Sequence, residues 1–267
     1  MPKATQERAS ARYWRLQLSL GNLSAAVGSP RAAHINPGAR VSTVSIGPGR
    51  LCWVIDDVLA QPDRWVQWAL GQEFLPTADN AFPGKLCGVP PALWQALESF
   101  FIEHVRNAMG GRRLIEGYGR MSLVTLPEAS LRPCQWLCHR DRVAPAAGDL
   151  LFAASVLYLF SDVRLGGTSF YEPRKSPVET EQLLRDAQQL SNADFSARYG
   201  VKQAYLSGSN EYFEQVGHVP AAWNRLIVYD GGQFHSGQID HPELLSDSPA
   251  HGRLSLNGFF ACRRNAR

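Results

Sequence analysis

The sequence lacks the features of membrane, secreted and nucleic-acid-binding proteins. No stretch approaches the roughly 20 consecutive apolar residues of a membrane helix, and no signal-peptide-like apolar segment precedes the first charged residues. The five cysteines are odd in number and irregularly spaced, which argues against a disulfide framework. The net charge of +3, from 27 basic and 24 acidic residues, is too balanced to favour nucleic acid or a membrane surface. These absences predict a cytoplasmic protein.

The composition is that of an ordinary globular protein, with 45% hydrophobic and 19% charged residues in 267. We divide the chain into an N-terminal extension (1–48), a helical support region packed on the core (49–116), and a β-rich core (117–267). In the support region, RLCWVIDDVL (50–59) predicts a strand that leads into a helix, which Asp63 after Pro62 could start. Residues 90–111 predict the longest helix, because apolar residues recur there at helical spacing.

From residue 117 onward, short β-type runs alternate with turns rich in glycine and proline. The runs predict strands at Tyr118–Leu126, Gln135–His139, Ala153–Phe160, Thr168–Tyr171, Tyr212–Val216, Arg225–Tyr229, Phe234–Ile239 and Arg253–Cys262. An insertion at 173–211, with helices at 178–190 and 194–199, separates the fourth strand from the fifth. The pattern predicts a mainly β protein with a sandwich or jelly-roll barrel.

A candidate metal site begins with His139 and Asp141 in the stretch QWLCHRD. Residues two apart on an extended segment project to the same face, so both side chains can reach one ion. His235, in QFHSG, supplies a second imidazole from another β-type run, and the small residues Ser236 and Gly237 leave room beside it. Two histidines and one carboxylate are the ligand set of non-haem iron(II) oxygenases.

A candidate carboxylate-binding pair follows in the stretch RLSLNGFF. Arg253 opens this predicted strand and Ser255 shares its face. A guanidinium offers a planar fork of donors that matches a carboxylate. Because an arginine inside a barrel is costly without an anion, a bound dicarboxylate would resolve the cost.

The succession of His-x-Asp, YLF, GGTSFY, NRLIVYDGGQFHSG and RLSLNGFF resembles the Fe(II)/2-oxoglutarate dioxygenase superfamily over residues 118–262. Within it, the chain is most similar to a group of bacterial oxygenases that has no assigned substrate. The resemblance implies a double-stranded β-helix (a cupin-like jelly roll) and an iron(II) ion. Its ligands would be His139, Asp141 and His235. Arg253 and Ser255 would bind the distal carboxylate of 2-oxoglutarate, with Tyr158 as a further contact.

The activity implied by the resemblance uses 2-oxoglutarate and O2 to hydroxylate a C–H bond. The substrate stays open among an amino acid, a peptide or protein side chain and a small metabolite, and the oligomeric state is open as well. Trp136 and Tyr171 are candidates for lining the substrate pocket, as aromatic residues often do. The alternative is a cupin-like or degenerate jelly-roll binding module without 2-oxoglutarate turnover. The complete ligand set and Arg253-x-Ser255 favour the oxygenase.

Overall fold

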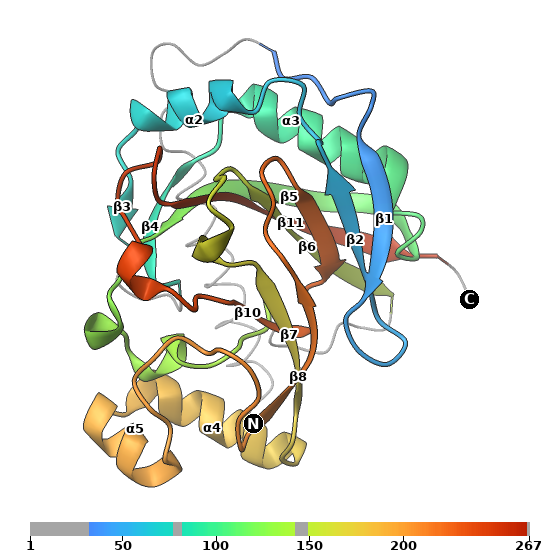
Figure 1. Ribbon diagram of the computed structural model, residues 1–267. Helices are drawn as coiled ribbons and strands as arrows, with labels where there is room; N and C mark the ends of the chain where they lie inside the picture. The colour runs from blue at the N-terminus through green and yellow to red at the C-terminus, as the bar shows by residue number, and fades with distance from the viewer. Residues whose placement is uncertain (1–31, 77–81, 142–148, 266–267) are drawn as a thin grey trace.

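The computed structural model describes residues 32–76, 82–141 and 149–265, in which two antiparallel sheets face each other and helices cover both outer sides (Figure 1). The strands are β1 (Arg40–Ser45), β2 (Leu51–Asp56), β3 (Leu75–Pro76), β4 (Gly84–Gly88), β5 (Gly111–Val124), β6 (Leu150–Tyr158), β7 (Thr168–Pro173), β8 (Phe213–Val219), β9 (Leu226–Asp230), β10 (Phe234–Gly237) and β11 (Arg253–Arg264). The α-helices are α2 (Asp63–Leu70), α3 (Pro91–Phe100), α4 (Pro177–Gln189) and α5 (Asn192–Tyr199). Short 3-10 turns lie at Glu128–Ser130, Pro133–Gln135, Val163–Leu165 and Pro242–Leu244.

Strands that follow one another in the core are divided between the two sheets, as in a jelly roll. The larger sheet has the order β1-β2-β9-β6-β11-β5-β4-β3, and the smaller has β10-β7-β8. The segment at His139 joins the smaller sheet through an isolated antiparallel bridge to His235 on β10. In chain order, β5, the His139 segment, β6, β7, β8, β9, β10 and β11 thus distribute over the sheets as the strands of a double-stranded β-helix do. The predicted fold class is confirmed.

Two predicted elements differ from the structure. The strand expected at Gln135–His139 is wrong, because its first residue closes the 3-10 turn Pro133–Gln135. The Arg132 N–H, just before this turn, donates to Gln135 Oε1 at 2.8 Å. Within the expected strand only His139 pairs with another strand, through its isolated bridge to His235. The helix expected over 90–111 is shorter, since α3 passes into a π-helical turn at Phe101–Val105 and Gly111 already begins β5.

The region before residue 117 adds strands to the larger sheet. β1 pairs with β2 from Arg40↔Asp56 to Ser45↔Leu51, and β2 pairs with β9. Every residue of β1 is exposed, so no apolar alternation marked it in the sequence. The predicted boundary at residue 48 therefore falls between two paired strands, and the division into three regions stays a prediction. Residues 1–31 lie outside the described residues.

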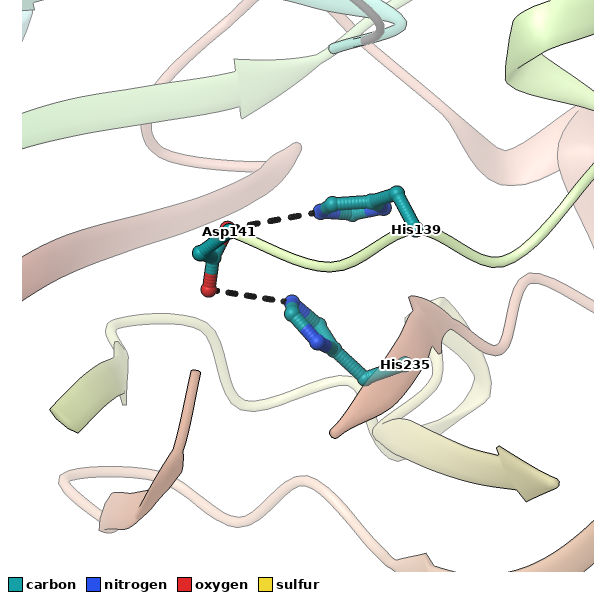
Figure 2. Close-up of side chains that lie close together, drawn as sticks. All are labelled: His139, Asp141 and His235. Carbon is teal, nitrogen blue, oxygen red and sulfur yellow. Dashed lines mark ion pairs between the residues drawn. The ribbon is translucent and has the colours of Figure 1, made fainter. Parts of the chain in front are cut away.

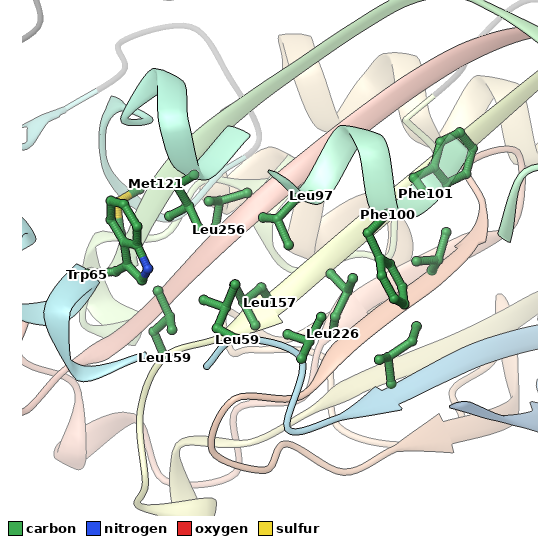
Figure 3. Close-up of a cluster of buried hydrophobic side chains, with 14 of the residues drawn as sticks. Leu59, Trp65, Leu97, Phe100, Phe101, Met121, Leu157, Leu159, Leu226 and Leu256 are labelled. Atoms are coloured by element: carbon green, nitrogen blue, oxygen red, sulfur yellow. The ribbon is translucent and has the colours of Figure 1, made fainter. Parts of the chain in front are cut away.

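Alternation along β11 separates the core from the interior of the barrel. Leu254, Leu256 and Phe260 belong to an apolar cluster under α2 and α3, and Figure 3 shows Leu256 within it. Arg253 and Ser255, in contrast, face the space between the sheets. The same period of two is expected for every strand of a sheet that is covered on both sides. One face of the larger sheet thus builds the core, and the other is left for the site.

This division gives a stability prediction. Leu256 is fully buried, so Leu256→Ala should lower the free energy of unfolding by about 2–5 kcal/mol through the cavity that it leaves. Ile115→Ala, on β5 at 50% exposure, is the matched control and should change stability by less than about 0.5 kcal/mol. Urea unfolding measures both variants, and equal losses would contradict the assignment of Leu256 to the core.

The helices of the insertion cover the outer face of the smaller sheet. α4 begins with a capping box, in which Ser176 Oγ accepts from the Glu179 N–H and Glu179 Oε2 accepts from the Ser176 N–H. Leu183 of α4 and Phe195 of α5 are buried in a cluster with Phe234 of β10. The insertion between the fourth and fifth predicted strands is thus a packed layer behind the site.

The five cysteines are all free and buried. None of the helices in residues 32–76, 82–141 and 149–265 is both long and apolar enough to cross a bilayer.

Candidate metal and cosubstrate site

Backbone hydrogen bonds bring the His139 segment against β10. The N–H groups of His139 and His235 each donate to the other residue's carbonyl oxygen at 2.9 Å, and the Asp141 N–H donates to Gly231 O at 3.0 Å. Directly opposed residues of an antiparallel pair project their side chains to the same face. The two imidazole rings accordingly lie 4.4 Å apart between centroids. The main chain therefore fixes where these side chains converge.

The structure brings together the three residues that the sequence predicts as metal ligands (Figure 2). Asp141 Oδ1 lies 3.6 Å from His139 Nε2, and Asp141 Oδ2 lies 3.4 Å from His235 Nε2. One ligand atom from each residue falls within 4.8 Å of the others. Such a set of two nitrogens and one carboxylate oxygen suits iron(II) and leaves coordination positions for other ligands.

The hydrogen bonding around the cluster fits a bound cation. His235 Nδ1 lies 3.0 Å from the Gln233 carbonyl oxygen, so a proton on Nδ1 leaves Nε2 free to bind a metal. Asp141 Oδ2 is buried and makes no hydrogen bond with any described residue. Its 3.4 Å contact with His235 Nε2 does not have hydrogen-bond geometry. A buried carboxylate oxygen without a hydrogen bond is costly, and a metal ion would satisfy it.

The charge states also fit. Burial lowers the pKa of His235 to about 4, so its imidazole is neutral at pH 7. Burial alone would raise the pKa of Asp141, but the nearby His235, His139 and Arg120 outweigh it and the pKa is lowered. A neutral imidazole beside an ionised carboxylate is the form in which these side chains bind a divalent metal.

The three residues lie in a cavity of about 140 Å³ between the sheets. This volume is below the roughly 300–1,000 Å³ of pockets that enclose drug-sized ligands. Arg253 and Ser255 also line the cavity, as do several residues without a predicted role, including Arg120, Thr168, Tyr205 and Tyr229.

Arg253 is a buried cation, and not all of its N–H donors have an acceptor among the described residues. Its Nε donates to the carbonyl oxygens of Leu165 at 2.9 Å and Gly166 at 3.2 Å, and its Nη2 donates to Gly167 O at 2.8 Å. Among the described residues, its Nη1 makes no hydrogen bond and no carboxylate pairs with it. Burial lowers the pKa of Arg253, which is 5% exposed. A desolvated guanidinium fixed on one side is suited to an anionic ligand on the other.

The two other residues predicted to bind the cosubstrate, Ser255 and Tyr158, differ in their position relative to the cavity. Ser255 is in the cavity wall, where its hydroxyl donates to Asn257 Oδ1 at 3.3 Å. Tyr158 is fully buried behind the wall, and its hydroxyl lies 2.7 Å from Thr168 Oγ1. Thr168, in contrast, lines the cavity. The predicted contact of Tyr158 with the cosubstrate stays a prediction, and its ring lies 6.0 Å from Arg253 Cζ.

Trp136 and Tyr171 do not line the cavity, contrary to the expectation from sequence. Trp136 is 1% exposed and packs edge to face on Phe195 of α5, with 5.8 Å between the ring centroids. Tyr171 follows Phe170 on β7, so the two side chains lie on opposite faces of the smaller sheet. Phe170 faces the barrel interior, and Tyr171 faces the core under α4 and α5.

Sequence reasoning missed Arg120 and Asn257, which pair across β5 and β11 and both line the cavity. The sequence did contain a pattern that could have identified both residues. In GRMSLV and RLSLNG, polar residues alternate with buried apolar ones, as expected for a strand with a polar inner face.

Gly237 gives a direct test of the space between the cluster and Arg253. A Cβ at this position would lie 3.4 Å from Arg253 Nη2, an ordinary contact, but a branched side chain would cover the guanidinium. We expect Gly237→Val to raise the 2-oxoglutarate concentration needed for half-saturation at least about tenfold, and Gly237→Ala to have little effect. Titration with the cosubstrate measures both, and equal behaviour of the two variants would contradict this placement.

A double-stranded β-helix with a His-x-Asp…His cluster at its interior is the arrangement that defines the Fe(II)/2-oxoglutarate dioxygenase superfamily, and the resemblance in sequence therefore extends to the fold. The chain belongs to the family described as "Family of unknown function (DUF6445)", whose profile matches residues 37–260. A search of curated proteins gives no match.

Solved structures with similar folds include three proteins. HygX from Streptomyces hygroscopicus, with nickel and 2-oxoglutarate bound, is 13% identical with a TM-score of 0.42, covering 79% of this chain and 82% of that one. An N-substituted L-amino acid dioxygenase from Burkholderia ambifaria AMMD is 12% identical with a TM-score of 0.37, covering 80% and 86%. The non-heme alpha ketoglutarate dependent epimerase SnoN from nogalamycin biosynthesis is 11% identical with a TM-score of 0.35, covering 77% and 73%.

Proposed function

We propose that the protein is an iron(II)- and 2-oxoglutarate-dependent oxygenase that hydroxylates a C–H bond of a small molecule, an amino acid or a peptide side chain. The observation that carries the proposal is the combination, in one small cavity, of a cluster suited to iron(II) and a buried arginine without an acidic partner among the described residues. A metal-binding module that did not use an organic acid would have no need of the second feature.

The residues have separate parts in this proposal. His139, Asp141 and His235 would hold iron(II), which, with 2-oxoglutarate and O2, supplies the oxidising chemistry. Arg253 would bind the distal carboxylate of 2-oxoglutarate through Nη1, and the carbonyls of Leu165–Gly167 keep its guanidinium in place. Gln233 orients the His235 ring through its carbonyl oxygen.

The test is an anaerobic titration of the iron(II)-loaded protein with 2-oxoglutarate, followed by visible absorption. Chelation of the metal by the keto acid is expected to produce a weak charge-transfer band, and addition of O2 should then release succinate. Iron binding without the band favours a cupin-like or binding-module function. Failure to bind iron(II) at all would remove the basis of the proposal.

A further inference from the structure

We propose that the exposed strand β1 is a dimerisation surface, and that two copies of the chain pair their β1 strands antiparallel about a two-fold axis at Thr43. The larger sheets of the two copies would then form one continuous sheet. The partner is a second copy of this chain, held mainly by backbone hydrogen bonds. This inference goes beyond the proposed function and does not depend on it.

Strand β1 is the free edge of the larger sheet, and Figure 1 shows it beside β2 at the margin of that sheet. All six of its residues are exposed, so neither the helices on one face nor the smaller sheet on the other covers it. In the part of the chain that the structure describes, no strand pairs with its outer side. The strand thus extends beyond both layers, where a second copy can reach it.

Other edges of the two sheets have protection that β1 lacks. At the opposite edge of the larger sheet, β3 is only two residues long and contains Pro76. At the edge formed by β8, the register with β7 is irregular after Phe170. Natural proteins use short strands, prolines, bulges and charges to prevent edge-to-edge pairing. Apart from Arg40 at its start, β1 has no charged residue, no proline and no irregularity in its register with β2.

The turn after β1 shows which of its backbone groups point outward. The Ile46 N–H donates to Arg50 O at 3.1 Å, so these two residues form a hydrogen-bonded pair at the end of the β1–β2 ladder. Hydrogen-bonded and non-hydrogen-bonded positions alternate along an antiparallel pair. The N–H and C=O groups of Val41, Thr43 and Ser45 therefore point away from β2, toward the free edge.

The positions of these groups suit pairing of the strand with itself. When Thr43 of both copies lies on the two-fold axis, Val41 of each copy is opposite Ser45 of the other. All three residues then occupy hydrogen-bonded positions, where each opposed pair exchanges two backbone hydrogen bonds. Two threonines face each other at the centre, which is a favourable cross-strand pair. The outward groups of β1 are thus complementary to themselves in this register.

Exposed apolar side chains of the β1–β2 hairpin would be covered in the dimer. Val41 is 52% exposed, Val44 37% and Leu51 47%. Leu51 is opposite Ser45 in the hairpin, and Val41 of the second copy would flank the same small serine from the other side. On the other face of the sheet, Val44 of each copy would lie opposite Ser42 of its partner. Pairing would therefore remove apolar surface from water on both faces.

The charges at the two ends of the interface are complementary. The register places Arg40 of one copy opposite Ile46 of the other, next to the turn after β1. Arg40 forms an ion pair with Asp57 at 2.9 Å, and Arg50, in that turn, forms one with Glu172 at 3.5 Å. Each end would thus bring together two positive and two negative side chains, and no excess of like charge would oppose association.

Sedimentation velocity of the full chain over a range of concentrations tests the inference. We expect the mass to rise from that of one chain toward that of two, with a dissociation constant of roughly 1–100 µM, because paired short strands form a small interface. Thr43→Lys and Thr43→Glu each place like charges opposite each other at the axis, and each should weaken the dimer about tenfold or more. A 1:1 mixture of the two variants should regain the affinity of the wild type, because opposite charges then meet.

The matched control is Ile115→Lys, which changes an equally exposed residue on β5 and should dimerise as the wild type does. Equal melting temperatures of all variants at low protein concentration establish that the substitutions leave the fold intact.

A cross-link gives a second readout that does not require a tight dimer. Opposed residues of a hydrogen-bonded pair have Cα atoms about 5.5 Å apart, a distance that a disulfide spans. Thr43→Cys should therefore form a covalent dimer under mild oxidation. The native cysteines are buried and do not compete. Ile115→Cys should stay largely monomeric under the same conditions.

Three results would overturn the inference: a wild-type chain that stays monomeric at about 300 µM, a dimer that both charge substitutions leave unchanged, or a mixture that associates no better than either variant alone. A dimer that persists in both variants uses another surface. Thr43 lies outside the cavity of the metal cluster. The charge-transfer titration therefore decides the proposed function separately, whatever the oligomeric state.

Discussion

Arg253→Lys is expected to raise the KM for 2-oxoglutarate by roughly 10- to 100-fold while changing iron(II) affinity little. Lysine keeps the positive charge but has one nitrogen, and it cannot at once satisfy the carbonyls of Leu165–Gly167 and grip a carboxylate. Steady-state kinetics give the KM, and a metal titration gives the iron affinity. An equal loss of both would mean that Arg253 supports the metal cluster instead of the cosubstrate.

The same substitution has a structural cost that must be separated from the catalytic one. Buried carbonyl oxygens that lose a donor destabilise a fold by about 1–3 kcal/mol. Arg263→Lys is the matched control, because Arg263 lies on the same strand but at its exposed end, in an ion pair with Asp149. It should leave both stability and KM essentially unchanged. If thermal unfolding shows Arg253→Lys to be folded at the assay temperature, its raised KM reports on the cosubstrate.

His235→Ala should reduce iron-dependent decarboxylation of 2-oxoglutarate by more than about 100-fold, because the loss of a ligand exceeds the 10- to 100-fold typical of residues that only orient ligands. His235 is buried and central to the cluster, whereas His241 is exposed and paired with Glu243. His241→Ala is therefore the control and should retain activity. Succinate release and the iron-induced rise in melting temperature are the two measurements.

Two results would contradict the assignment of His235 as a metal ligand. If His235→Ala still turns over 2-oxoglutarate in an iron-dependent way, the metal does not bind at this cluster. If iron(II) does not raise the melting temperature of the wild type either, the cluster is a set of structural contacts.

Strands β5, β6, β9 and β11 of the larger sheet could be predicted, because their residues alternate between the apolar core and the interior of the barrel. On β6, β9 and β11 the outward residues are apolar and packed, and the turns between strands contain glycine or proline. β1 could not be predicted, since all of its residues are exposed and only its pairing with β2 makes it a strand. The Gln135–His139 segment misled in the opposite way, because its apolar residues are buried in the core below α4 without forming a strand.

The metal-binding part of the site could be predicted, because residues with metal-binding side chains also lie on segments that pair through their backbones. His139, Asp141 and His235 stand in a recognisable spacing, and the structure brings them together. Trp136 and Tyr171 were misplaced because aromatic character does not tell which face of a sheet a residue occupies. A shift of one position along a strand exchanges the cavity for the core, as Phe170 and Tyr171 illustrate.

The two faces of strand β11 therefore have separate roles. Its even-numbered residues Leu254, Leu256 and Phe260 maintain stability, while Arg253 and the odd-numbered residues beyond it define what the cavity can hold. Substitutions at Asn257 or Phe259 change the wall of the cavity and leave the apolar cluster under α2 and α3 intact. A single-residue deletion in the strand would have the opposite effect, since it would exchange the two sets and lose fold and chemistry together.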